Sequence, residues 1–94
     1  MLYKLLCPVS MEDGSSIKAV MVRKPTEADL AATRLAVSIE HERRGKPLSL
    51  PLRSSQMIAH VIDFPVDVVR KFAVRDCCRL HDIIAKAYRE AGIE

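Results

Sequence analysis

The sequence is poor in aromatic residues and in glycine. Tyr and Phe make up 4% of its 94 residues and Trp is absent, so any core must be built mainly from aliphatic side chains. With only three Gly, the chain contains neither of the common phosphate-binding patterns, Gly-x-x-x-x-Gly-Lys and Gly-x-Gly-x-x-Gly. No apolar run approaches the ~20 residues that a membrane-spanning helix needs. We therefore expect a soluble protein that has no phosphate-binding loop and does not insert into a membrane.

Cysteine is also scarce. The three cysteines are an odd number, and the adjacent pair Cys77 and Cys78 has poor geometry for a mutual disulfide. This pattern favours a reduced, cytoplasmic protein. Cys77 and His81 share a helical face, but no Cys-x-x-Cys pair exists and the other candidate ligands are scattered, so we predict no metal site.

The same residues also raise the question of catalysis. A Cys–His nucleophile pair needs a third orienting group, a positive environment and a pocket. Arg75 and Arg79 supply charge near Cys78, but no glycine-rich oxyanion loop is apparent. We therefore predict a protein that is not an enzyme, with no catalytic residues and no cofactor.

The charge balance does not point to a specialised partner. Fifteen Lys and Arg against twelve Asp and Glu give a net charge of +3, divided evenly along the chain. Hydrophobic residues make up 49% and charged residues 29%, which is ordinary globular usage and excludes a disordered chain. The length fits one small domain, which we place at 1–94.

The first part of the chain predicts a β-hairpin at 1–24. Short β-prone runs at 3–6 and 17–23 flank Asp13-Gly14, a pair suited to a tight reversal. A lone hairpin is only marginally stable and needs a helix to pack against. That helix is predicted at 26–44, with Thr26 as N-cap, Asp29 completing an approximate capping box, and Gly45 after its end.

The predicted helix at 26–44 is apolar on two sides. Leu30 and Val37 lie nearly opposite a face formed by Ala28, Ala31, Ala32, Leu35 and Ile39. A surface helix needs only one apolar stripe. One side is therefore free to pack against the hairpin and the other against a second helix or a partner protein.

The remainder predicts further helices at 54–92. The segment 48–52 is interpreted as an apolar connector, because Pro51 interrupts it. Helices are then expected at 56–62, 66–72 and 74–91, the last with an apolar stripe formed by Cys77, Leu80, Ile84, Ala87, Tyr88 and Ala91. The predicted fold class is α+β, an N-terminal β-hairpin packed against a small bundle of three to four α-helices.

Residues 55–71 also have the rhythm of a helix-turn-helix. Ala59 falls where the first helix needs a small residue, and Val69 where the second packs inward. However, Asp63 stands at the turn position usually filled by Gly, and the second helix carries Asp67 and little that reads bases. A small DNA-binding regulator is therefore the alternative interpretation, although the charge pattern speaks against nucleic acid as a partner.

Two blocks of sequence resemble the small tail assembly chaperone family of Mu-like and related contractile-tailed bacteriophages and prophages. The first holds Pro8-Val9, Asp13-Gly14 and the run 17–30, which is similar to the family's strand ending in Arg-x-Pro-Thr-x-x-Asp-Leu. The second runs from Ile58-Ala59 to Val69 and continues with Asp76 and Leu80, similar to the family's C-terminal helices. The chain departs from the family at Asp63, where Gly is common, and at Cys77-Cys78.

This resemblance implies a role in virion morphogenesis. Members of the family act in the host bacterial cytoplasm, where they keep the long tape measure protein soluble and help to recruit tail tube subunits. They are absent from the mature virion and have no active site. The resemblance thus implies two protein partners, the tape measure protein and the tail tube protein, and leaves a homo-oligomer open.

A chaperone for a long helical client needs exposed apolar surface rimmed by charge. The aliphatic residues of this chain outnumber what one small core consumes, and we expect the surplus to contact the client. The predicted partner-binding residues are Leu30, Val37, Leu50, Leu52 and Ile58.

Overall fold

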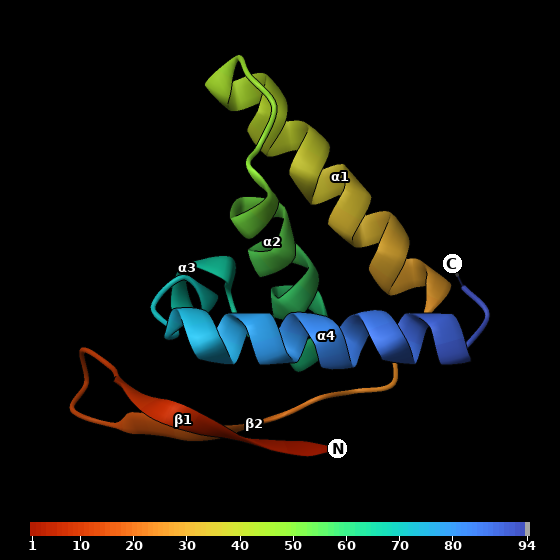
Figure 1. Ribbon diagram of the computed structural model, residues 1–94. Coiled ribbons are helices and arrows are strands. Elements are labelled where there is room, and N and C mark those ends of the chain that lie inside the picture. Colours follow the sequence, from red (N-terminus) through yellow and green to blue (C-terminus); the bar gives the residue numbers. More distant parts are fainter. Residues whose placement is uncertain (94) are drawn as a thin grey trace.

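The computed structural model describes residues 1–93, so residue 94 of the predicted domain lies outside the described residues. Two strands, β1 (Leu2–Ser10) and β2 (Ser16–Met21), precede four helices. These are α1 (Glu27–Arg44), α2 (Leu50–Ile62), α3 (Val66–Val69) and α4 (Val74–Glu90). The predicted fold class, a β-hairpin packed against a helical bundle, is confirmed. In Figure 1 the hairpin lies on one side of α4, while α1 and α2 rise from the other side.

The hairpin is antiparallel and contains an irregularity in β1. Leu2 pairs with Met21 and Lys4 with Ala19, but Val9 pairs with Ile17, so several residues of β1 face one residue of β2. Such a bulge bends the strand and leaves some of its backbone groups without ladder partners. Gly14, with φ of 88°, turns the chain, as the Asp13-Gly14 pair predicted. The first strand extends to Ser10, beyond the predicted 3–6.

A buried carboxylate on α4 satisfies the unpaired amides of this bulge. The N–H groups of Leu6 and Cys7 donate to Asp76 Oδ1 and Oδ2 at 2.8 and 3.1 Å. The Tyr3 hydroxyl donates to Asp76 Oδ1 at 2.9 Å. Asp76 is 0% exposed. Burial opposes its ionisation, but the three hydrogen bonds together with the charge of Arg79 outweigh burial and lower the Asp76 pKa.

The lowered Asp76 pKa predicts a loss of stability in acid. Because the pKa in the folded protein lies below the ordinary value of 3.8, the contribution of Asp76 is complete above that value and is lost as the pH falls through the folded pKa. The urea midpoint should thus hold from pH 7 to about 5 and fall steeply below about 4. A midpoint that rises or stays level between pH 4 and pH 2 would contradict this assignment.

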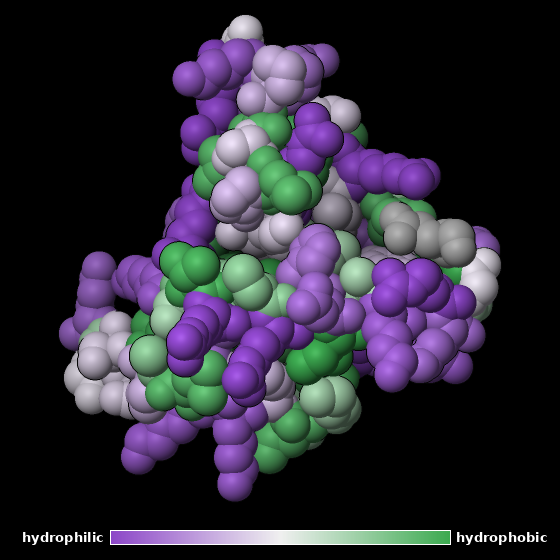
Figure 2. Space-filling model, in the orientation of Figure 1, coloured by the Kyte–Doolittle hydropathy of each residue, from purple (hydrophilic) through white to green (hydrophobic). Residues whose placement is uncertain are grey.

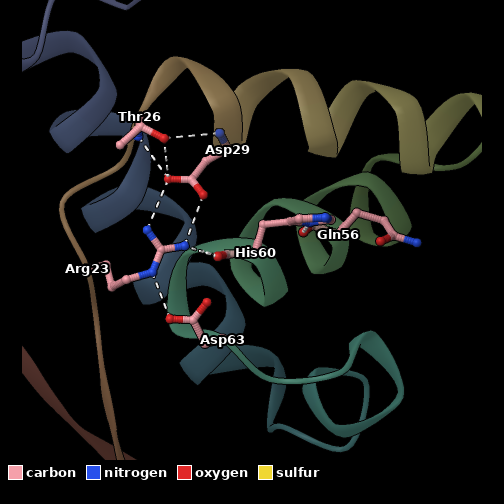
Figure 3. A network of polar contacts seen from close by, with 6 residues as sticks. All are labelled: Arg23, Thr26, Asp29, Gln56, His60 and Asp63. Carbon is pink, nitrogen blue, oxygen red and sulfur yellow. Dashed lines mark hydrogen bonds and ion pairs between the residues drawn. The ribbon is translucent and has the colours of Figure 1, made fainter.

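A second polar network joins the segment that follows β2 to α1 and α2 (Figure 3). The Arg23 guanidinium contacts Asp29 in α1 at 2.9 Å and Asp63 at the end of α2 at 2.7 Å, and it also donates to the His60 carbonyl. Thr26 and Asp29 form the predicted capping box, and the hydrogen bond from Arg23 lowers the pKa of Asp29. Gly45 ends α1 in the left-handed conformation, as predicted.

The structure corrects the prediction for the segment 48–52. That segment was expected to be a connector, but α2 begins at Leu50 and includes Pro51 in its first turn. Proline is tolerated there because the first N–H groups of a helix have no intrahelical acceptor. The single turn α3 ends at Val69, short of the predicted 72, and α4 ends at Glu90 with Gly92 left-handed just beyond it.

One core joins the hairpin to the helices. It is mostly aliphatic, with two tyrosines and one phenylalanine, as the scarcity of aromatics predicted. Its buried members are Tyr3, Leu5, Val9, Val20, Val22, Ile58, Ala59, Val61, Ile62, Val68, Val69, Phe72, Leu80, Ile84 and Tyr88. Across residues 1–93, none of the helices is both long enough and apolar enough to cross a bilayer.

Candidate functional site

The described part of the chain contains an apolar groove of about 580 Å³. It lies where the first turns of α2 meet the α3–α4 turn and the first half of α4. We call it the α2–α4 groove. The residues lining it are Leu50, Pro51, Leu52, Ser54, Ser55, Arg70, Phe72, Val74, Cys77, Cys78, His81 and Asp82.

Local sequence rules place the apolar residues of the groove. Since α2 already starts at Leu50, its first turn carries two leucines and a proline toward the opening. On α4, Val74, Cys78 and His81 recur at helical spacing on one face, beside the buried stripe of Leu80 and Ile84. The result is an apolar surface shared between two helices that are separated in the sequence by α3.

The mouth of the groove is strongly apolar. Leu50 is 71% exposed and Val74 is 79% exposed, the two highest values among the large hydrophobic side chains that are exposed. Single exposed leucines are common on protein surfaces, but here the exposed residues border a concave apolar surface. In the view of Figure 2, green hydrophobic areas stand among purple hydrophilic side chains.

The polar groups in the groove are few. Ser54 Oγ and His81 Nδ1 lie 3.0 Å apart and connect α2 to α4. Burial raises the pKa of the Cys77 thiol, which keeps it in the neutral and poorly nucleophilic form. Its sulfur contacts the Val69 carbonyl at 3.8 Å. These contacts hold the walls together, and none of them places an activated thiolate in the groove.

Three cationic residues are neighbours in sequence of residues that line the groove. These are Arg53, Lys71 and Arg75, all of them exposed. Within residues 1–93 none of the three makes an ion pair. Arg70 also lines the groove and approaches Asp67 at 3.4 Å. Asp82 is the carboxylate among the lining residues.

The structure brings together two of the predicted partner-binding residues. Leu50 and Leu52 both line the groove. Leu30 instead packs against the core, and Val37 is half-buried on α1. Ile58 was placed wrongly on the client surface, because its side chain is 0% exposed and belongs to the core of α2.

Several apolar residues of the groove and of α1 were not among the predicted partner-binding residues. The exposed Val74, which shares a helical face with Cys78 and His81, and the buried Phe72 both line the groove but were not selected. On α1, the side chains that remain exposed are Leu35 at 62% and Ile39 at 57%. Both belong to the face that lies opposite Leu30 and Val37, so the helix is two-sided as predicted but with Leu30 turned inward.

The alternative sites are less well formed. Within the helix-turn-helix segment 55–71, α3 has a single turn, and both Val68 and Val69 are buried. A helix of one turn does not offer the several base-facing side chains that a recognition helix uses in the major groove. Over the described part of the chain, no three or more His, Cys, Asp or Glu side chains gather in a way that could hold a metal ion.

Comparison with known proteins finds no match for this chain. No protein-family model matches the chain, and no curated protein or solved structure matches it either.

Proposed function

We propose that the protein is a non-catalytic tail assembly chaperone of a bacteriophage or prophage. It would act in the host bacterial cytoplasm during tail morphogenesis, bind the tape measure protein and tail tube subunits, and be absent from the mature virion. The two blocks that resemble the tail assembly chaperone family supply the identity of these partners. The α2–α4 groove supplies a surface on which such a client would bind.

The groove is the single observation that carries this proposal. A chaperone of an elongated helical client must present apolar surface while remaining soluble itself, which requires charge around that surface. Leu50 and Val74 provide exposed apolar side chains, and the charged residues Arg70 and Asp82 also line the groove. Helical segments commonly bind through apolar side chains placed in a groove between helices.

Co-expression tests the proposal. We expect the tape measure protein encoded beside this chain to remain soluble when both are produced together and to aggregate when produced alone. An unrelated protein of similar size, expressed at the same level, should give no protection. Equal solubility of the tape measure protein in the presence and absence of this chain would refute the chaperone function.

A further inference from the structure

We propose that the outer edge of β2 binds an extended, acidic segment of a partner protein, which adds a third strand to the sheet. The outer edge is formed by the backbone groups of β2 that point away from β1. This surface lies on the hairpin, apart from the α2–α4 groove. The inference goes beyond the proposed function, because it holds whether or not the chain is a chaperone.

The backbone of β2 has hydrogen-bonding groups that point away from β1. The Met1 amino group donates to the Val22 carbonyl at 2.9 Å and the Val22 N–H donates to the Met1 carbonyl at 2.7 Å, so these residues form a hydrogen-bonded pair. Because such pairs alternate along an antiparallel ladder, Val20 also points toward β1, whereas Ala19 and Met21 point outward. The sheet described for residues 1–93 has two strands, so no third strand pairs with Ala19 or Met21 there.

The two edges of the sheet differ in how they are protected. The edge of β1 is covered in part, because α4 contacts this strand and Asp76 accepts two N–H groups of the bulge. β1 also contains Pro8 and the bulge, two features by which proteins keep an edge from pairing. The six residues of β2 contain no proline. Just beyond its end, the Arg23 N–H donates to the Val61 carbonyl, so the free part of the edge lies within β2.

Apolar side chains are exposed beside the outer edge of β2. Of the eight large hydrophobic side chains that are exposed in residues 1–93, four lie in or next to the hairpin strands: Met1, Leu2, Leu6 and Met21. Met21 is 57% exposed, and it lies directly opposite Leu2 of β1. A strand added beside β2 would place an apolar side chain next to Met21 on the same face and bury surface of both.

The charge of the two strands specifies the partner. Across β1 and β2 the charged side chains are Lys4 and Lys18, and both are exposed. Neither makes an ion pair within residues 1–93. Lys4 lies opposite Ala19, whose methyl group leaves room for a long acidic side chain of the added strand to reach Lys4, since neighbouring strands are about 4.8 Å apart. The inferred segment therefore has acidic residues opposite Ala19 and Lys18 and an apolar residue opposite Met21.

The same lysines argue against a second copy of this chain as the occupant. Two β2 strands paired edge to edge would bring Lys4 and Lys18 of both copies into one sheet. The carboxylates of the hairpin, Glu12 and Asp13, lie in the turn, where Asp13 already accepts from Ser15. Lysine on an exposed edge is a common device against such self-pairing. An acidic segment avoids this repulsion and gains ion pairs.

Two strand peptides test the charge requirement. Both would have about eight residues, an ordinary strand length, with an apolar residue opposite Met21. They differ in having either Glu or Lys at the two positions opposite Ala19 and Lys18. By fluorescence anisotropy at low salt, we expect the Glu peptide to bind about fivefold more tightly than the Lys peptide. Equal affinities of the wild-type protein for the two peptides would refute the inference.

Amide hydrogen exchange followed by NMR reports whether the peptide extends the sheet. Bound Glu peptide should slow exchange of the Ala19 and Met21 amide hydrogens, which gain acceptors, and leave Val20 unchanged, because its N–H already points to β1. Binding without slower exchange at Ala19 and Met21 would place the peptide elsewhere and overturn the proposal. Protection of both amides that grows with protein concentration in the absence of peptide would identify a second copy as the occupant and overturn it as well.

Charge reversal in the strands completes the test. With folding checked by circular dichroism, the double variant Lys4→Glu, Lys18→Glu should bind the Lys peptide more tightly than the Glu peptide. The control Lys46→Glu, Lys71→Glu makes the same change of net charge at exposed positions outside the hairpin and should retain the wild-type preference. If the strand variant still prefers the Glu peptide, the two lysines do not select the partner and the inference fails.

Discussion

Replacing Asp76 with Ala is expected to lower the free energy of unfolding by about 3–5 kcal/mol, comparable to breaking a buried charged pair. The change leaves the N–H groups of Leu6 and Cys7 and the Tyr3 hydroxyl without their shared acceptor. Each unsatisfied buried donor costs about 1–3 kcal/mol. Since a small domain is stable by only about 5–15 kcal/mol, the variant should be partly or wholly unfolded at moderate temperature.

Urea denaturation followed by circular dichroism measures this effect. Asp82→Ala is the matched control, because Asp82 is an exposed carboxylate on the same helix and makes no ion pair within residues 1–93. Asp76→Asn keeps one acceptor oxygen and should fall between the two. A midpoint for Asp76→Ala equal to that of Asp82→Ala would show that the carboxylate does not hold the hairpin to α4.

Ile58→Ala is the second substitution with a large expected effect. Ile58 is fully buried, so the change removes packed methyl and methylene groups and leaves a cavity. Such changes cost about 2–5 kcal/mol. Leu50→Ala, on the same helix but at a position that is 71% exposed, should change stability by less than about 0.5 kcal/mol.

The two alanine variants are compared by their unfolding free energies and by the solubility of the co-expressed tape measure protein. We expect Ile58→Ala to lose stability, and Leu50→Ala to keep stability and protect the tape measure protein less well. The reverse pattern would mean that Ile58 faces the partner and Leu50 the core, which would contradict the placement of both residues.

Features that depend on neighbouring residues were predictable from the sequence. The capping box of Thr26 and Asp29, the left-handed Gly45 and the Asp13-Gly14 turn all appear where they were expected. In each of them the side chain and the backbone that it serves are at most a few residues apart. The same local rules explain why the hairpin and α1 were placed correctly.

Features that depend on distant partners were not predictable. In the sequence, Asp76 is only a polar residue in the first turn of a predicted helix. Its hydrogen-bond partners lie about 70 residues earlier, in β1. Ile58 and Leu50 are both apolar residues of one segment, and only the packing of α2 between α1 and α4 decides which of them is buried. The α2 boundary was missed because Pro51 was interpreted as a breaker, whereas a proline in the first turn of a helix is tolerated.

Only part of the candidate site was predictable from the sequence, because the rest depends on contacts between segments that are not neighbours in the sequence. The surplus of aliphatic residues predicted exposed apolar surface, and Leu50 and Leu52, two of the predicted partner-binding residues, line the groove. Val74 was not selected, because the apolar stripe predicted for α4 follows the residues of that helix that pack into the core. The groove forms only where the first turn of α2 contacts the first half of α4. No pattern of neighbouring residues in the sequence indicates that contact.

The most direct test of the account is co-expression of the tape measure protein with groove variants of this chain. Leu50→Asp places a charge at the apolar mouth, and Leu35→Asp places the same charge at a comparably exposed position on α1. With both variants folded, as checked by circular dichroism, we predict that Leu35→Asp keeps the tape measure protein soluble and that Leu50→Asp does not. If both variants keep it soluble to the same extent as the wild-type chain, the α2–α4 groove is not the client-binding site.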